Sequence, residues 1–167
     1  MAAGGCSCTF ARWRLTWGST SSRCHGWSSA PTYDLSAEVL GIKPVAPGYE
    51  RLLFAPHPVD VEYADGAVPT PRGDVKAGWR RRPDGGLEMT LALPEGITGE
   101  AWSPTPGAPG SITINGKKVW EAGKLLSKDA VIFAQESRSS PAGEPGHIVL
   151  VVRGGNTYHI TTCTQSG

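Results

Sequence analysis

The sequence predicts a mainly β protein, an antiparallel sandwich or barrel that follows a single helix. Helical periodicity is confined to residues 30–40. Beyond Pro44, apolar and polar side chains alternate in several short runs, as they do in strands with one buried and one solvent-exposed face. Turn sequences rich in Gly and Pro separate these runs, and short strands with frequent turns favour antiparallel pairing.

We expect residues 30–40 to form one helix. Pro31 suits its first turn, where a missing N–H removes no intrahelical hydrogen bond, and Gly41 followed by Pro44 ends it. The helix carries two apolar rows, formed by Tyr33, Ala37 and Leu40 and by Leu35 and Val39. A helix with two apolar rows is expected to be buried on two sides.

The strands are predicted from alternation and from the turns between them. The apolar face of the first run contains Val59, Val61 and Tyr63, and that of the second contains Trp79. Asn115-Gly116 indicates a tight hairpin, because both central residues of a type I′ turn need positive φ. The expected strands are 59–64, 75–80, 87–93, 112–114, 117–119, 130–135, 147–152 and 157–162, and the expected loops are 103–110 and 138–146.

Composition excludes several classes of function. The 167 residues carry 16 Lys and Arg against 15 Asp and Glu, so the chain lacks the positive excess typical of a nucleic-acid-binding protein. No apolar run is long enough for a membrane-spanning helix, and residues 1–20 lack the apolar stretch of a secretory signal, which leaves the compartment open. The four cysteines do not have zinc-site spacing, so no metal or other cofactor is expected.

Three tryptophans of the β region, Trp79, Trp102 and Trp120, could stack on sugar rings. Trp79 alternates in phase with core positions and is expected to be buried, whereas the phase of Trp102 and Trp120 is open. A stand-alone carbohydrate-binding β-sandwich is therefore an alternative interpretation of the chain.

Longer sequence motifs resemble a family. The run Cys24-His25-Gly26-Trp27-Ser28 precedes Pro31-Thr32-Tyr33 and Leu40-Gly41-Ile42, residues 67–73 read AVPTPRG, and Gly155-Asn156-Thr157-Tyr158 follows near the end. Together these motifs resemble the C-terminal part of a bacterial-type α-L-rhamnosidase of glycoside hydrolase family 78. The resemblance covers residues 22–162 and is strongest up to Leu93.

The resemblance implies a domain organisation. Enzymes of this family have an (α/α)₆ catalytic barrel followed by a C-terminal antiparallel β-sandwich. Residues 22–43, with the helix at 30–40, would be the end of the barrel, residues 44–162 the sandwich and 163–167 a tail. Residues 1–21 contain no Asp or Glu and show no periodicity, so we expect an irregular or non-native segment there.

The resemblance also implies where the chemistry lies. An inverting glycosidase uses two carboxyl groups, and in this family both precede the segment that contains His25. The region expected to hold the base, residues 9–13, contains no glutamate. We therefore expect no catalytic residue in this chain, a barrel as its missing intramolecular partner, and a rhamnose-containing glycoside as the substrate of the parent enzyme. His25 would contact the sugar hydroxyls and Trp27 would support the pocket wall.

Overall fold

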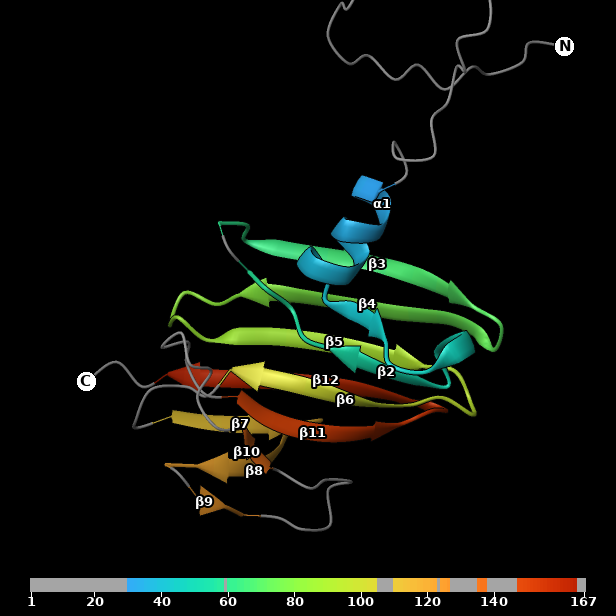
Figure 1. The fold of residues 1–167 in the computed structure, drawn as a ribbon. Coiled ribbons are helices and arrows are strands. Elements are labelled where there is room, and N and C mark those ends of the chain that lie inside the picture. Colours follow the sequence, from blue (N-terminus) through green and yellow to red (C-terminus); the bar gives the residue numbers. More distant parts are fainter. Residues whose placement is uncertain are drawn as a thin grey trace, which may run out of the picture.

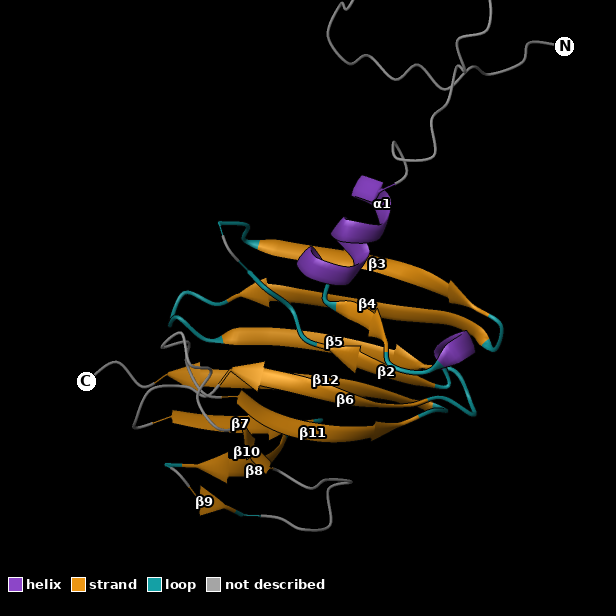
Figure 2. Cartoon of the chain, in the orientation of Figure 1, coloured by secondary structure: helices purple, strands orange, loops and turns teal. Residues whose placement is uncertain are grey.

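A computed structural model describes residues 30–58, 60–104, 110–122, 124–126, 135–137 and 147–164. They form two stacked β-sheets with a short helical segment at one edge (Figures 1 and 2). One sheet has the order β1-β2-β6-β11-β10 and the other the order β3-β4-β5-β12-β7-β8-β9. The predicted mainly β, antiparallel architecture is confirmed, with one exception: β2 (Arg51–Phe54) runs parallel to β6 (Thr98–Pro104).

The first sheet also contains β1 (Ile42–Pro44), β10 (Gln135–Ser137) and β11 (His147–Arg153). The second sheet contains β3 (Tyr63–Thr70), β4 (Gly73–Arg81), β5 (Leu87–Leu93), β12 (Asn156–Thr164), β7 (Gly110–Ile114), β8 (Lys117–Glu121) and β9 (Lys124–Leu125). A 3₁₀ turn, η3 (Pro47–Tyr49), precedes β2. The strand expected at 130–135 falls outside the described residues except for Gln135, which begins β10.

The core lies between the two sheets. Its fully buried side chains come from both, and they include Leu52, Phe54, Ile97, Ile148 and Leu150 on one side and Val75, Met89, Leu91, Ile112 and Ile160 on the other. The alternation predicted for 75–80 and 87–93 is confirmed, because Val75, Ala77 and Trp79 are buried while the residues between them are not.

The face assigned to the first predicted strand is wrong. Val61 and Tyr63 are 40% and 53% exposed, and β3 begins only at Tyr63. Val59, the third residue assigned to this face, lies outside the described residues. The register explains the difference. Val68 of β3 is opposite the buried Val75 of β4, so even-numbered residues of β3 face the core and Tyr63 faces solvent.

The predicted helix is present, but it is wound in two ways. An α-helical turn, α1 (Ala30–Asp34), continues as a π-helical turn, η2 (Leu35–Val39), in which the Leu40 N–H donates to the Leu35 carbonyl over 2.8 Å. Gly41 follows at φ +89°, the left-handed conformation expected after a helix. The segment η2 contacts both β1 and β3, the edge strands of the two sheets, and so closes this edge of the sandwich.

Asn115 and Gly116 form the tight hairpin turn that the sequence predicts, with φ of 49° and 78°. The Asn115 amide oxygen also accepts the His159 N–H at 2.8 Å, which ties the turn to the neighbouring strand β12.

Candidate functional site

The two residues predicted to contact substrate, His25 and Trp27, lie outside the described residues, so both remain predictions. Among the described residues, no three His, Cys, Asp or Glu side chains lie close enough together to hold a metal ion. No helix in the described ranges is long and apolar enough to cross a membrane.

The three tryptophans lie in different environments. Trp79 is 3% exposed and its indole N–H donates to the Val39 carbonyl over 2.8 Å, so it anchors η2 to the sheet. Trp120 is 5% exposed and belongs to the core, so it cannot serve as an exposed sugar-stacking surface. Trp102 alone among them is half-buried, on the outer face of the five-stranded sheet.

An apolar groove of about 420 Å³ surrounds Trp102 on this outer face. Val45, Leu53 and Val151 are among the apolar residues that line it. The indole N–H donates to a Glu100 carboxylate oxygen over 3.1 Å, and the ring lies 5.8 Å from that of His147. The tryptophan is therefore held in one orientation beside an apolar surface that neither sheet covers.

The helical segment carries a second apolar surface. Ala37 and Leu40 are buried against the sandwich, at 1% and 7% exposure, whereas Tyr33 and Leu35 are 58% and 60% exposed. The two-sided burial expected for this helix is thus met on one side only within the described residues.

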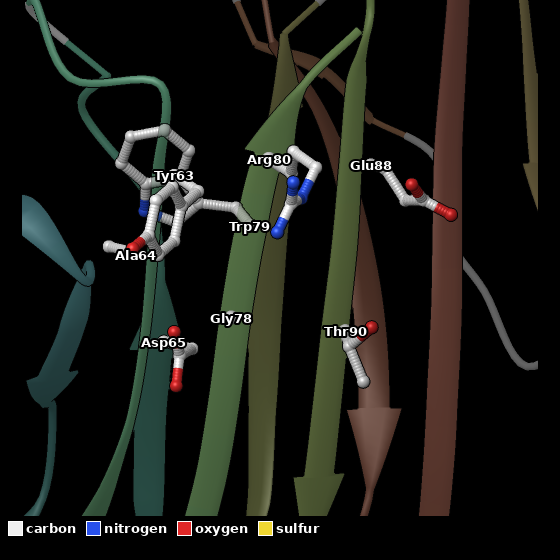
Figure 3. A pocket seen from close by; sticks show the side chains of 8 residues that line it. All are labelled: Tyr63, Ala64, Asp65, Gly78, Trp79, Arg80, Glu88 and Thr90. Carbon is white, nitrogen blue, oxygen red and sulfur yellow. The ribbon is translucent and has the colours of Figure 1, made fainter.

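The outer face of the seven-stranded sheet holds a smaller open pocket of about 200 Å³ (Figure 3). Strand pairing lines up its residues in two rows, Tyr63, Arg80 and Glu88 in one and Asp65, Gly78 and Thr90 in the other. This pocket was not predicted from the sequence, because the local alternation places Tyr63 in the core. Alternation counted from the apolar Val68 and Val75 along the same strands gives the outer face, and this pattern could have identified the pocket.

The two carboxyl groups with shifted pKa values, Glu38 in η2 and Asp84 in the turn before β5, are each held in an ion pair. The Lys43 ammonium, hydrogen-bonded at 2.8 Å, lowers the pKa of Glu38. The Gly86 N–H, which donates to Asp84 over 3.0 Å, lowers the pKa of that carboxyl, and Arg82 adds to the effect. Both carboxyl groups are thus stabilised as anions, the opposite of what a general acid requires.

Part of this chain is similar to known proteins. Residues 41–112 match the family model described as the bacterial α-L-rhamnosidase C-terminal domain. A 67-residue stretch, 40% of the chain, is 31% identical to an α-L-rhamnosidase from Alteromonas sp. (strain LOR).

Two solved structures share the fold. The α-L-rhamnosidase from Dictyoglumus thermophilum aligns over 83% of this chain with a TM-score of 0.65 and 20% identity. The Streptomyces avermitilis α-L-rhamnosidase complexed with L-rhamnose aligns over 83% with a TM-score of 0.54 and 22% identity. The matched part of this chain spans only 7% of the Alteromonas protein and 14% and 11% of the two structures.

Proposed function

Because residues 41–112 match the C-terminal domain of bacterial α-L-rhamnosidases, we propose that this chain is the C-terminal structural part of such an enzyme. In this proposal residues 44–162 are a β-sandwich that braces an (α/α)₆ catalytic barrel, and residues 22–43 are the end of that barrel. The parent enzyme would hydrolyse terminal α-L-rhamnosides with inversion.

The observation that carries the proposal is the exposed face of the helical segment. Ala37 and Leu40 pack on the sandwich while Tyr33 and Leu35, on the same two turns, are more than half exposed. Exposed large apolar side chains beside a packed core are typical of interaction surfaces. A barrel that continued this helix would bury Tyr33 and Leu35 and complete the two-sided packing that the sequence pattern predicts.

The groove around Trp102 supports the same role from the five-stranded sheet. Val45, which lines this groove and is 55% exposed, directly follows β1, the strand that η2 contacts. Half-buried aromatic side chains set in apolar surroundings are enriched at domain and protein interfaces. We assign this outer face to the barrel as well.

Catalysis would belong to the barrel. Inverting hydrolysis needs a carboxylic acid with a raised pKa and a second carboxylate about 6.5–9.5 Å away. The lowered pKa values of Glu38 and Asp84 make both groups poor proton donors near neutral pH. In the assembled enzyme His25 would offer its ring nitrogens to sugar hydroxyls and Trp27 would support the pocket wall.

The proposal is tested by titrating the chain with a bacterial α-L-rhamnosidase from which the C-terminal domain has been removed, in isothermal titration calorimetry. We expect a one-to-one complex that Leu35→Ser weakens at least tenfold. Leu126→Ser is the matched control, since Leu126 is 52% exposed and follows β9 at the far edge of the other sheet. Equal weakening by both variants, or no complex with the unmodified chain, would contradict the proposed interface.

A further inference from the structure

The open pocket on the seven-stranded sheet faces away from the core and from the five-stranded sheet that we assign to the barrel. All six residues named above point outward from β3, β4 and β5, as the alternating burial of these strands requires. Figure 3 shows Tyr63 and Asp65 on one side, Glu88 and Thr90 on the other, and Gly78 between them.

The pocket exists because Gly78, in the middle strand, adds no side chain to the outer face of the sheet. Asp65 and Thr90 are the pairing partners of Gly78 on its two sides, so their backbones are two strand spacings apart, about 9.5 Å. Gly78 has an ordinary φ, so no backbone requirement calls for glycine at this position. A Cβ there would lie 3.2 Å from that of Asp65 and would begin to fill the gap. The absent side chain leaves a floor of bare backbone whose width suits one small ring.

The walls offer an aromatic face and hydrogen-bonding groups of both kinds. Tyr63 is 53% exposed, and the Arg80 guanidinium lies 5.1 Å from its ring centroid, which fixes the two side chains relative to each other. Asp65 and Glu88 are acceptors, Arg80 is a donor and the Thr90 hydroxyl is both. Among the described residues, neither Asp65 nor Glu88 forms an ion pair, so their oxygens can accept hydrogen bonds from a ligand.

This combination selects a class of ligand. Anions are disfavoured by two carboxylates, and a metal ion is disfavoured because no third ligand of suitable type lies nearby among the described residues. A polyhydroxylated ring instead has hydroxyls for the acceptors and donors of the pocket and an apolar surface for its aromatic ring. Such a ligand needs no net charge. A pocket of about 200 Å³ is smaller than the roughly 300–1,000 Å³ of drug-sized sites and accommodates a single sugar ring.

We propose that the pocket formed by Tyr63, Asp65, Gly78, Arg80, Glu88 and Thr90 binds one neutral pyranose unit of a glycoside. The ring lies over Gly78, its hydroxyls bond to Asp65, Glu88 and Arg80, and its apolar edge contacts Tyr63. On this outer face the sugar stays accessible while the opposite sheet contacts the barrel. The sugar class follows from the pocket, and the choice of an L-rhamnoside as the first probe rests on the proposed function.

The test is an NMR titration of the ¹⁵N-labelled full chain with methyl α-L-rhamnoside and, separately, methyl α-D-glucoside. We expect saturable amide shifts confined to β3, β4 and β5 around Gly78, with a dissociation constant in the millimolar range for at least one of the two sugars. Tyr63→Ala and Gly78→Val should each weaken binding at least tenfold.

Two controls separate loss of the site from loss of the fold. Leu126→Ala removes a large side chain of similar exposure (52%) elsewhere, and Ala67→Val enlarges a side chain on the same sheet face outside the pocket. Both controls should bind as the unmodified chain does.

Absence of saturable shifts with both sugars would overturn the proposal. So would unchanged binding by Tyr63→Ala, or shifts that centre on Trp102 rather than Gly78. These outcomes do not affect the barrel titration, and failure of the barrel titration does not change how the sugar titration is interpreted. The two proposals can therefore fail independently.

Discussion

The anchoring of the helical segment by Trp79 gives a quantitative prediction. The Trp79 indole is 3% exposed, and its N–H donates to the carbonyl of Val39 at the end of η2. Trp79→Phe keeps an aromatic ring in the core but removes this hydrogen bond. It also leaves part of the space of the larger ring unfilled.

The cost can be estimated from these two losses. A hydrogen bond of this kind contributes about 0.5–1.5 kcal/mol net. The lost ring atoms cost about 1–2 kcal/mol in transfer and cavity energy, well below the 3–5 kcal/mol of complete truncation to alanine. Together they predict destabilisation by about 1.5–3.5 kcal/mol. For a chain of this size that lowers the melting temperature by about 3–14 °C.

Urea denaturation followed by far-UV circular dichroism measures the change, and Trp102→Phe is the matched control. Trp102 is half-buried and donates to Glu100 on the outer face, so its replacement should cost less than about 1 kcal/mol. Equal destabilisation by the two variants, or a Trp79→Phe effect below about 0.5 kcal/mol, would refute the assignment of Trp79 as the anchor.

Three further substitutions test local features of the fold. Gly41→Ala should destabilise the chain by more than about 3 kcal/mol in urea denaturation, because φ is +89° and a Cβ would lie 2.5 Å from backbone atoms of Ala55 and Pro56. A loss under about 1 kcal/mol would contradict this. Thr162→Val should cost about 1–3 kcal/mol by thermal denaturation, because the buried hydroxyl accepts the Leu87 N–H at 2.6 Å and donates to the Leu87 carbonyl at 3.1 Å; an unchanged melting temperature would disprove that role. The Gly86 N–H lowers the pKa of Asp84 below its ordinary 3.8 in the folded state, so this carboxylate stabilises the fold above about pH 4 and the contribution is lost as the pH falls through the folded pKa. Asp84→Asn should therefore reduce stability at pH 6 more than at pH 2.5, and equal losses at both would contradict the assignment.

Local sequence patterns predicted those elements whose structure depends on local interactions. The Asn115-Gly116 turn and the glycine after the helix were predictable because each position needs a positive φ that few residues adopt. The buried face of β4 was predictable because Val75, Ala77 and Trp79 alternate without interruption. The resemblance to rhamnosidases rested on residue runs rather than on periodicity, and the family match at residues 41–112 bears it out.

Features that depend on pairing between distant segments were not predictable in the same way. The face of Tyr63 is set by the register of β3 against β4, and a local alternation shows the period but not which face is buried. The parallel pairing of β2 with β6 joins residues 47 positions apart, such as Arg51 and Thr98, which no local pattern reveals. The pocket over Gly78 needs three strands in register, so it became visible only in the folded chain.

The central proposal is that this chain supports the catalytic barrel of a glycosidase and has no turnover alone. Turnover of an aryl α-L-rhamnoside by the purified chain tests it most directly. An intact α-L-rhamnosidase serves as the positive control. The account predicts release of the aryl group at the rate of buffer alone. Release above that rate, abolished by Glu88→Gln, would contradict the account and would make the carboxylates over Gly78 a catalytic site.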